Sequence, residues 1–567
     1  MTAGILLAML AGGGVARAGT FENRWFYLSG SPFAPNAVEE VGQLVRTAGE
    51  AGLNGMLWSC GFDDCDRWTD RQKARILEIK AICDRSGVEI IPLVWSVGYG
   101  TMLGRDPNLV AAQPVEDMPY VADAAGEKAV WSDSATPLLP NGDFEETGPK
   151  LLPHWHFWDQ EGVVTFRDTE IRHGGAASVR LEPSYGKNPH GHARICYACD
   201  LKPRHLYRLS VWIRTEGLAV REGQPGLSVL AHLCTAHGER PVSVSPKLAS
   251  TQDWMRVELP FASGEATAAR FYVGTWGGAG GRVWVDDVAL SEPGLPLFLQ
   301  RAGTPVTVRD AASGRVYRAG KDYELPPVRS LRHAQDAEAA AIRIVKGGAI
   351  KPGARLLVSA YAPSVTASQQ LSTCMSEPAL YRYFDRSARA IQDLIRPRKW
   401  FLSMDEIRSG GTCAACEKRG VDMAHQLADC LKRQRASILR ASPGADIYVW
   451  SDMLDPAHNA HDNYYACKGT FAGVWDLIPK DLIVSCWYYE KRDVSLPFFA
   501  ARGFRTLGAA YYDADTLDTS RDWLDSCRRT KGCTGIMYTT WRKKYALLKP
   551  FGEMLRECPD VTPPRSW

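Results

Sequence analysis

Short apolar strands alternate with amphipathic helices at both ends of this chain, and this rhythm constrains its fold more than any other feature. The first expected strands span residues 25–28, 55–58 and 88–95, and helical patterns cover 38–52 and 70–86 between them. Alternation of this kind is typical of βα units that build a parallel sheet.

The same rhythm returns near Glu377 and continues to the end of the chain. The expected strands there span 399–404, 446–451, 482–486, 505–510 and 533–539. Eight strands are the number that closes a (β/α)8 barrel. We therefore predict an α/β fold, a TIM barrel whose strands 1–3 lie in residues 19–136 and whose strands 4–8 lie in 366–560.

A long stretch without helical periodicity interrupts this barrel. Residues 137–293 hold only β-type runs, which Gly and Pro separate. This spacing indicates an all-β jelly-roll sandwich, inserted after strand 3. Such a place tolerates insertions because βα loops lie on the surface. Residues 294–365 are expected to be a β-rich connecting segment.

The first 18 residues have the pattern of an export signal. Residues 5–15 are apolar, and Ala16-Arg17-Ala18 is a small-x-small cleavage site. The predicted location is therefore secreted or periplasmic, and the 15 cysteines fit an oxidising compartment. No stretch is long and apolar enough to span a membrane. The net charge of +3, without basic runs, gives no sign of a nucleic-acid partner.

An acidic pair, Asp405-Glu406, follows the fourth expected strand. Cleavage of a glycosidic bond needs one carboxylic acid to protonate the leaving oxygen and a second group to stabilise the cationic centre. The structural alternative is an acidic pair at a helix entry. The other expected strand ends carry residues that we predict to contact a substrate, namely Trp58, Trp95, Trp450, Asp452, Trp487, Tyr511, Tyr512, Tyr538 and Trp541.

The segment Phe401-Leu-Ser-Met-Asp-Glu406 resembles the strand-four motif of glycoside hydrolase family 20, the β-N-acetylhexosaminidases. This resemblance implies substrate-assisted, retaining hydrolysis of O-glycosyl bonds without a catalytic cofactor. Glu406 would be the acid/base, and Asp405 would orient the 2-acetamido group of the sugar. One alternative is a two-carboxylate retaining glycosidase with Asp513 as the nucleophile. The other is a carbohydrate-binding protein without activity.

The inserted segment has a resemblance of its own. Its motifs at 140–145, 173–181 and 283–288 resemble carbohydrate-binding modules of the family 4/9/22 group. The resemblance implies an oligosaccharide, polysaccharide or glycoconjugate as partner, and a structural calcium ion held by Glu145, Asp286 and Asp287. The alternative is that these acids cap turns.

Two Cys-x-x-Cys pairs stand out among the cysteines, Cys413/Cys416 and Cys196/Cys199. Together they could form a four-thiolate zinc site. They fall in different expected domains, however, and we expect disulfides or reduced thiols instead. The pairs Cys60/Cys65 and Cys527/Cys533 are close enough in sequence to form disulfides.

Overall fold

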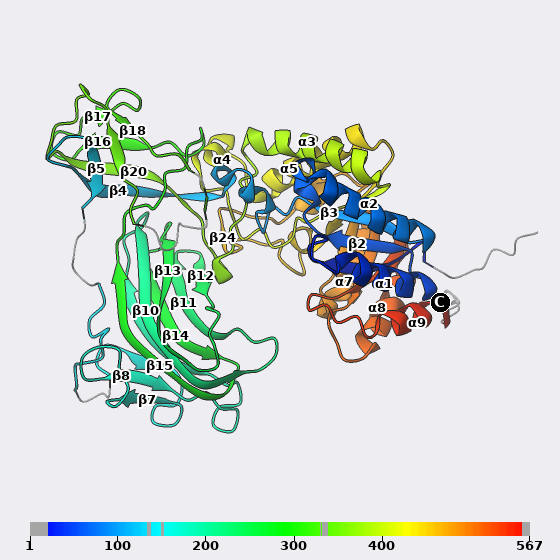
Figure 1. Cartoon of the computed structure of the whole chain (residues 1–567), viewed down its shortest axis with the longest axis horizontal. Coiled ribbons are helices and arrows are strands. Elements are labelled where there is room, and N and C mark those ends of the chain that lie inside the picture. Colours follow the sequence, from blue (N-terminus) through cyan, green and yellow to red (C-terminus); the bar gives the residue numbers. More distant parts are fainter. Residues whose placement is uncertain (1–20, 133–137, 149–151, 329, 332–337, 558–567) are drawn as a thin grey trace, which may run out of the picture.

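The structure is a computed structural model that describes residues 21–132, 138–148, 152–328, 330–331 and 338–557. Figure 1 shows three parts: the barrel with its helices at the right, a pair of curved sheets at the lower left, and a smaller sheet at the upper left. The predicted export signal, residues 1–18, lies outside the described residues. None of the described helices has the length and apolar character that a membrane crossing requires.

Eight parallel strands close into a barrel in the order β1, β2, β3, β21, β23, β25, β26 and β27. The pairing of β1 with β27, for example Trp25 with Met537, completes the ring. All eight strands lie where the sequence predicts strands. Their bounds are Asn23–Ser29, Gly55–Ser59, Glu89–Val94, Lys399–Leu402, Asp446–Trp450, Ile483–Cys486, Arg505–Tyr511 and Cys533–Thr539.

Side-chain alternation divides each barrel strand between two cores. Residues such as Tyr27, Leu57 and Phe401 point into the barrel and pack on one another there. Their neighbours along the strands, such as Phe26 and Leu402, belong to a larger outer core that includes helix residues. Consecutive strand residues face opposite sides, so residues two apart share a side.

Amphipathic helices lie between the barrel strands in the chain. In α3, for instance, Leu380, Phe384 and Ile391 are buried along one side. A capping box formed by Thr69 and Gln72 fixes the start of α2. The helices are α1 (Ala37–Glu50), α2 (Asp70–Arg85), α3 (Pro378–Ile395), α4 (Ala414–Arg419), α5 (Met423–Ala441), α6 (Val474–Leu477), α7 (Arg492–Ala501), α8 (Asp518–Arg529) and α9 (Leu548–Glu557).

The inserted segment forms two five-stranded antiparallel sheets, in the orders β13-β10-β15-β8-β7 and β12-β11-β14-β9-β6. Apolar residues of both sheets, among them Leu209, Val229 and Phe271, share one core. This arrangement is a jelly-roll-like sandwich. The strands are β6 (His156–Phe157), β7 (Thr165–Asp168), β8 (Ser178–Leu181), β9 (Ala193–Asp200), β10 (Leu206–Val220), β11 (Gly226–Thr235), β12 (Gly238–Val244), β13 (Gln252–Ala262), β14 (Ala268–Trp276) and β15 (Gly278–Ser291).

A third unit is a seven-stranded antiparallel sheet in the order β17-β16-β20-β4-β5-β19-β18. It joins segments of two expected domains, since β4 and β5 lie in the expected barrel segment 19–136 and the other strands lie in 294–365. The strands are β4 (Ala112–Ala122), β5 (Lys128–Trp131), β16 (Thr307–Asp310), β17 (Val316–Tyr317), β18 (Tyr323–Glu324), β19 (Ile342–Ile344) and β20 (Arg355–Pro363). A small parallel pair, β22 (Ser409–Gly410) and β24 (Ala466–Cys467), lies near the barrel.

The predicted fold class, an α/β TIM barrel interrupted by one jelly roll, is wrong for this chain. Helices account for only 25% of the structure, which is mostly β. The barrel also lacks a regular helical surround, because the only α-helix between β23 and β25 is α6, which has four residues. The prediction extended the α/β character of the two ends to the whole chain. It also assigned the strands of the seven-stranded sheet to the barrel or to its connections.

Candidate active site

A cavity of about 410 Å³ opens where the barrel strands end. Mouths of β-barrels are frequent places for small-molecule sites. Aromatic, hydroxyl and acidic side chains from several strand ends meet in it. Its lining consists of Tyr27, Ser59, Leu93, Ser96, Tyr99, Thr101, Ser403, Asp405, Glu406, Trp450, Trp487, Tyr512 and Trp541.

Two carboxylates, Asp405 and Glu406, line this cavity, and a third, Asp452, lies behind them. The hydroxyl of Ser403 donates to Asp405 Oδ1 at 2.8 Å. Asp452 lies underneath, completely buried. Its Oδ2 accepts the backbone N–H of Glu406 at 2.9 Å, and its Oδ1 accepts the indole N–H of Trp487 at 3.3 Å. Asp452 therefore positions the other residues, whereas Asp405 and Glu406 face the cavity.

Burial makes two of these acids easier to protonate. It raises the pKa of Asp405 to about 6, and the neighbouring Glu406 carboxylate adds to this shift. It raises the pKa of Asp452 to about 7, with a further contribution from Asp405. Low-polarity surroundings disfavour the charged form of a carboxyl group, and a nearby like charge disfavours it further. The site therefore holds protons at a pH where an exposed carboxyl group has lost them.

The Glu406 side chain is held by two donors. Arg408 Nη2 lies 2.9 Å from Oε1, and the hydroxyl of Tyr99 donates to Oε2. The Glu406 side chain remains 21% exposed, and 52% of Tyr99 is exposed. Burial of the hydroxyl and the Glu406 carboxylate raise the pKa of Tyr99. Tyr99 therefore keeps its proton beside Glu406.

The backbone of Glu406 has a strained conformation, with φ of 46°. A residue with a side chain enters this left-handed region at a cost, and such outliers gather at functional sites. Its neighbours maintain the conformation. Gln370 Nε2 donates to the carbonyl oxygens of Glu406 and Gly98, both at 2.8 Å. A Cβ on Gly98 would lie 2.0 Å from the carbonyl oxygen of Asp405, so only glycine fits there.

Aromatic rings form the walls around the carboxylates. Trp541 packs on Tyr27 with ring centroids 4.9 Å apart, and Trp450 lies 6.1 Å from Trp541. Trp487 and Tyr512 are parallel within 3°, with centroids 6.4 Å apart. Flat apolar faces beside acidic groups suit a ligand that has both apolar faces and hydroxyl groups.

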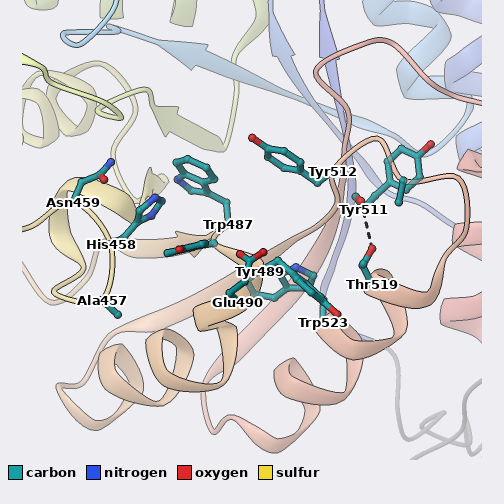
Figure 2. A pocket seen from close by; sticks show the side chains of 12 residues that line it. Ala457, His458, Asn459, Trp487, Tyr489, Glu490, Tyr511, Tyr512, Thr519 and Trp523 are labelled. Carbon is teal, nitrogen blue, oxygen red and sulfur yellow. Dashed lines mark hydrogen bonds between the residues drawn. The ribbon is translucent and has the colours of Figure 1, made fainter. Parts of the chain in front are cut away.

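A second cavity, of about 690 Å³, adjoins the first and shares Trp487 and Tyr512 with it. Figure 2 shows it, with these two rings above Glu490 in the view. His458 lies at its edge, 4.5 Å from the Trp487 ring. Burial lowers the pKa of His458 to about 4, so this imidazole is neutral at ordinary pH. Together the two cavities offer room for a ligand larger than one ring.

The structure brings only some of the predicted substrate-contacting residues to the first cavity. Trp450, Trp487, Tyr512 and Trp541 line it, as do both members of the acidic pair. Tyr511 lines the second cavity only. Asp452 is near but does not line either cavity.

Three predicted contacts lie in the outer core and were wrongly placed. Trp58 and Tyr538 are buried there because each follows a residue that points into the barrel. Trp95 turns outward through a left-handed backbone, with φ of 58°, and its indole N–H donates to Ser387 at 3.1 Å.

Several residues of the site were not predicted from the sequence. Tyr27 was within reach, because strand alternation places it on the same side as Trp25. Arg408 stands two residues after Glu406, and the sequence pattern gave it no role. Tyr99 and Gln370 come from loops whose path the sequence does not reveal. Ser96 and Thr101 lie in the same loop as Tyr99 and were missed for the same reason. Ser59 ends β2 on the same side as Leu57, so strand alternation could have placed it.

Asp513, the alternative nucleophile, caps a turn. Its carboxylate accepts the hydroxyl of Thr540 and the backbone N–H groups of Trp541 and Arg542. It is not part of the lining of either cavity. This position does not favour a role in attacking a sugar.

The predicted calcium ligands in the sandwich all contact one loop, residues 173–177. Glu145 Oε1 accepts the N–H groups of residues 176 and 177, and Asp286 Oδ2 accepts those of 173 and 174. Asp287 lies 2.6 Å from His173 Nδ1. Backbone donors thus occupy oxygens that a calcium ion would need. The three acids fit turn capping better than a shared ion, and calcium stays an untested prediction.

No family model matches the chain, and no curated protein matches it. The chain is similar to the enzymatically active domain of tailspike protein 4 from bacteriophage CBA120. The two share 13% sequence identity over an alignment that covers 28% of this chain and 21% of that chain, with a TM-score of 0.22. It is similar to the CBM22-1 xylan-binding domain of Paenibacillus barcinonensis Xyn10C, with 11% identity, 26% of this chain, 90% of that chain and a TM-score of 0.20. It is also similar to a cyclase from Fischerella sp. TAU, with 17% identity, 28% of this chain, 98% of that chain and a TM-score of 0.22. These local likenesses carry no conclusion about function.

Proposed function

We propose that this protein is a carbohydrate-active enzyme, a glycoside hydrolase whose reaction takes place in the cavity at the barrel mouth. The observation that carries the proposal is the meeting of Asp405, Glu406 and Asp452 among aromatic walls at the strand ends. Glycosidic cleavage requires a paired set of carboxyl groups in such a place, and sugar rings stack on aromatic faces.

Two of the three acids are free to contact a substrate. The Glu406 carboxylate is partly exposed and borders the cavity, and we assign it the acid/base role. To donate a proton it must give up the hydrogen bond from Tyr99, whose half-exposed ring has room to move. Asp405 is the second group, and its raised pKa allows it to give or accept a hydrogen bond near neutral pH. Asp452 is a positioning residue.

The finer proposal is substrate-assisted hydrolysis of a 2-acetamido sugar, as the family 20 resemblance implies. Asp405 would orient the acetamido group, whose carbonyl oxygen attacks the anomeric carbon. Glu406 would protonate the leaving oxygen and later take a proton from water. Tyr512 borders the same cavity and would donate to the acetamido oxygen. Family 20 enzymes usually carry an arginine on the first strand that holds the sugar's hydroxyls, whereas no arginine is among the lining residues of this cavity.

The sandwich would hold the substrate polymer near the cavity. Trp158 is 52% exposed on it and offers a face for a sugar ring. We propose a saccharide or glycoconjugate as the partner of both regions. A secreted or periplasmic location suits such a substrate. It is testable by sequencing the amino terminus of exported protein, which should begin at Gly19.

A panel of aryl glycosides tests the proposal. We expect hydrolysis of aryl 2-acetamido glycosides, inhibition by a thiazoline analogue, and little activity on matching glucosides or galactosides. Asp513→Asn serves as the control and should keep most of the wild-type rate. Equal rates on plain glycosides together with an inactive Asp513→Asn would favour the two-carboxylate alternative. Sugar binding without any hydrolysis would favour the non-catalytic alternative.

A further inference from the structure

Three buried cysteines meet beside the loop that follows Glu406. The sulfur atoms of Cys374, Cys413 and Cys416 lie 3.6, 3.6 and 3.5 Å apart. Each residue is at most 3% exposed. A disulfide would bring two sulfurs to about 2.05 Å, so these distances describe three separate sulfurs. Within the described part of the chain, this is the one group of three or more ligating side chains that converges closely enough for a metal ion.

Distant segments of the chain build this triad. Cys413 is the residue before α4 and Cys416 lies one turn into it, so both sulfurs share one side of the helix. Cys374 comes from the segment before α3, where its backbone N–H donates to the carbonyl of Leu109 at 2.7 Å. The Cys-x-x-Cys motif already indicates that Cys413 and Cys416 lie close together, whereas only the folded chain brings Cys374 beside them.

A buried cation accompanies the triad. The Arg301 side chain is only 6% exposed and interacts with Cys374 and Cys413. Its Nη2 donates to the carbonyl of Val110, its Nη1 lies 3.4 Å from Glu377 Oε1, and its Nε has no hydrogen-bond partner among the described residues. A buried guanidinium with unpartnered N–H groups is unfavourable unless negative charge lies nearby. Thiolates at the triad would add to the negative charge that the Glu377 carboxylate already supplies.

We propose that Cys374, Cys413 and Cys416 form a zinc site. Zinc binds thiolates at about 2.3 Å in a tetrahedron, whose sulfur–sulfur edges are then about 3.8 Å. The three observed distances match one face of such a tetrahedron after a small expansion. Soft thiolate ligands select zinc over calcium and magnesium. The three protein ligands leave one position for a non-protein ligand.

Binding is balanced in protons and charge. Each thiol loses its proton to solvent as its sulfur coordinates the metal. Three thiolates and one Zn²⁺ carry a net charge of −1, and the Arg301 guanidinium lies beside them and also pairs with Glu377. Coordination would also protect the sulfurs from oxidation in an oxidising compartment, where free thiols are vulnerable.

From outside the cavity, the metal would stabilise the two segments whose side chains hold Glu406 in place. The segment from Glu406 to Cys413 contains Arg408, which contacts Glu406 directly. The segment that ends at Cys374 contains Gln370, whose amide oxygen accepts from Arg408 Nη1 at 2.7 Å. A zinc ion would join these two segments at a second point. The inference stands on the cysteine geometry and holds whether or not the protein is a glycosidase.

Metal content of the full chain tests the proposal. We expect about one zinc per chain by elemental mass spectrometry after purification with reduced thiols. Replacement by Co²⁺ should produce sulfur-to-cobalt charge-transfer absorption, while Ca²⁺ and Mg²⁺ should not compete. Wild-type protein with reduced thiols that takes up neither zinc nor cobalt would overturn the proposal. So would a Cys413–Cys416 disulfide in the protein isolated from its native compartment.

Two double variants give the matched comparison. Cys413→Ser with Cys416→Ser should lower zinc content at least tenfold, whereas Cys196→Ser with Cys199→Ser in the sandwich should leave it unchanged. Equal zinc content in the two would contradict the proposal. Because the first variant could fail to fold, the cobalt titration of wild-type protein provides the independent reading.

Discussion

Two groups of three carboxylates, one at the barrel mouth and one in the sandwich, look alike in sequence and differ in the structure. In the barrel, Asp405 and Glu406 line a cavity, and Glu406 has a strained backbone. In the sandwich, Glu145 and Asp286 accept backbone N–H groups of one loop. Carboxylates that line a cavity are thus available to a ligand, whereas carboxylates that accept hydrogen bonds from the backbone stabilise the fold.

The largest expected effect distinguishes the two groups by activity. Glu406→Gln removes the proposed acid/base and should lower kcat/KM on an aryl 2-acetamido glycoside about 1,000-fold, since general acid–base catalysis contributes on that scale. The thermal midpoint should stay close to that of wild type. Glu39→Gln, on the exposed side of α1, is the control and should keep its activity. A Glu406→Gln protein with wild-type turnover would remove the catalytic interpretation.

The second effect concerns the pH dependence of stability. The pKa of Asp452 is raised to about 7 in the folded protein, whereas an unfolded Asp has a pKa of about 3.9. The folded state therefore holds this proton to higher pH, and the group lowers stability as pH rises from about 4 to 7.

Asp452→Asn should remove most of that loss, which is on the order of 4 kcal/mol, because its side-chain oxygen still accepts the Glu406 N–H without a charge. Unfolding followed by denaturant at pH 5 and pH 8 measures this effect. The variant should be more stable than wild type at both pH values, and its advantage should be clearly larger at pH 8 than at pH 5. Identical pH profiles of the two proteins would show that Asp452 does not retain its proton.

The third effect tests the sandwich group. Glu145→Ala removes an acceptor from the N–H groups of Ala176 and Ala177 and should cost about 1 kcal/mol of stability. Its activity on a small aryl glycoside should equal that of wild type, because the residue is remote from the proposed site. A large loss of activity without a loss of stability would show that Glu145 serves the reaction and not the fold of the sandwich.

The smallest expected effect concerns calcium. Since backbone donors already occupy oxygens of Glu145 and Asp286, chelation with EGTA should leave the thermal midpoint unchanged. A clear rise of the midpoint with added calcium would show that the loop rearranges around an ion, because a ligand that binds only the folded state stabilises it.

Strand positions were predictable because their periodicity is local. All eight barrel strands lie where the apolar runs place them, and the acidic pair follows the fourth. Side-chain direction was harder to foresee. Leu57 and Met537 point into the barrel, so strand alternation places the next residues, Trp58 and Tyr538, on the outer side. Trp95 points outward because its own backbone is left-handed, which the sequence pattern does not predict.

Long-range pairing was not predictable from a single sequence. Strands β4 and β20 pair across more than two hundred residues, and neither segment indicates its partner. The contacts of Tyr99 and Gln370 with Glu406 likewise depend on loop paths that only the assembled chain defines. The predicted fold class was wrong because it missed such long-range strand pairs, and the predicted site lacked the residues that these loops contribute.

One measurement tests the central claim most directly: proton NMR of an aryl 2-acetamido-β-glycoside during incubation with the wild-type protein. We predict cleavage, with the β-anomer of the free sugar appearing first, because substrate-assisted attack retains the anomeric configuration. Initial appearance of the α-anomer would contradict the proposed mechanism. A sugar that binds and stays intact would contradict the proposal that the barrel mouth is a hydrolytic site.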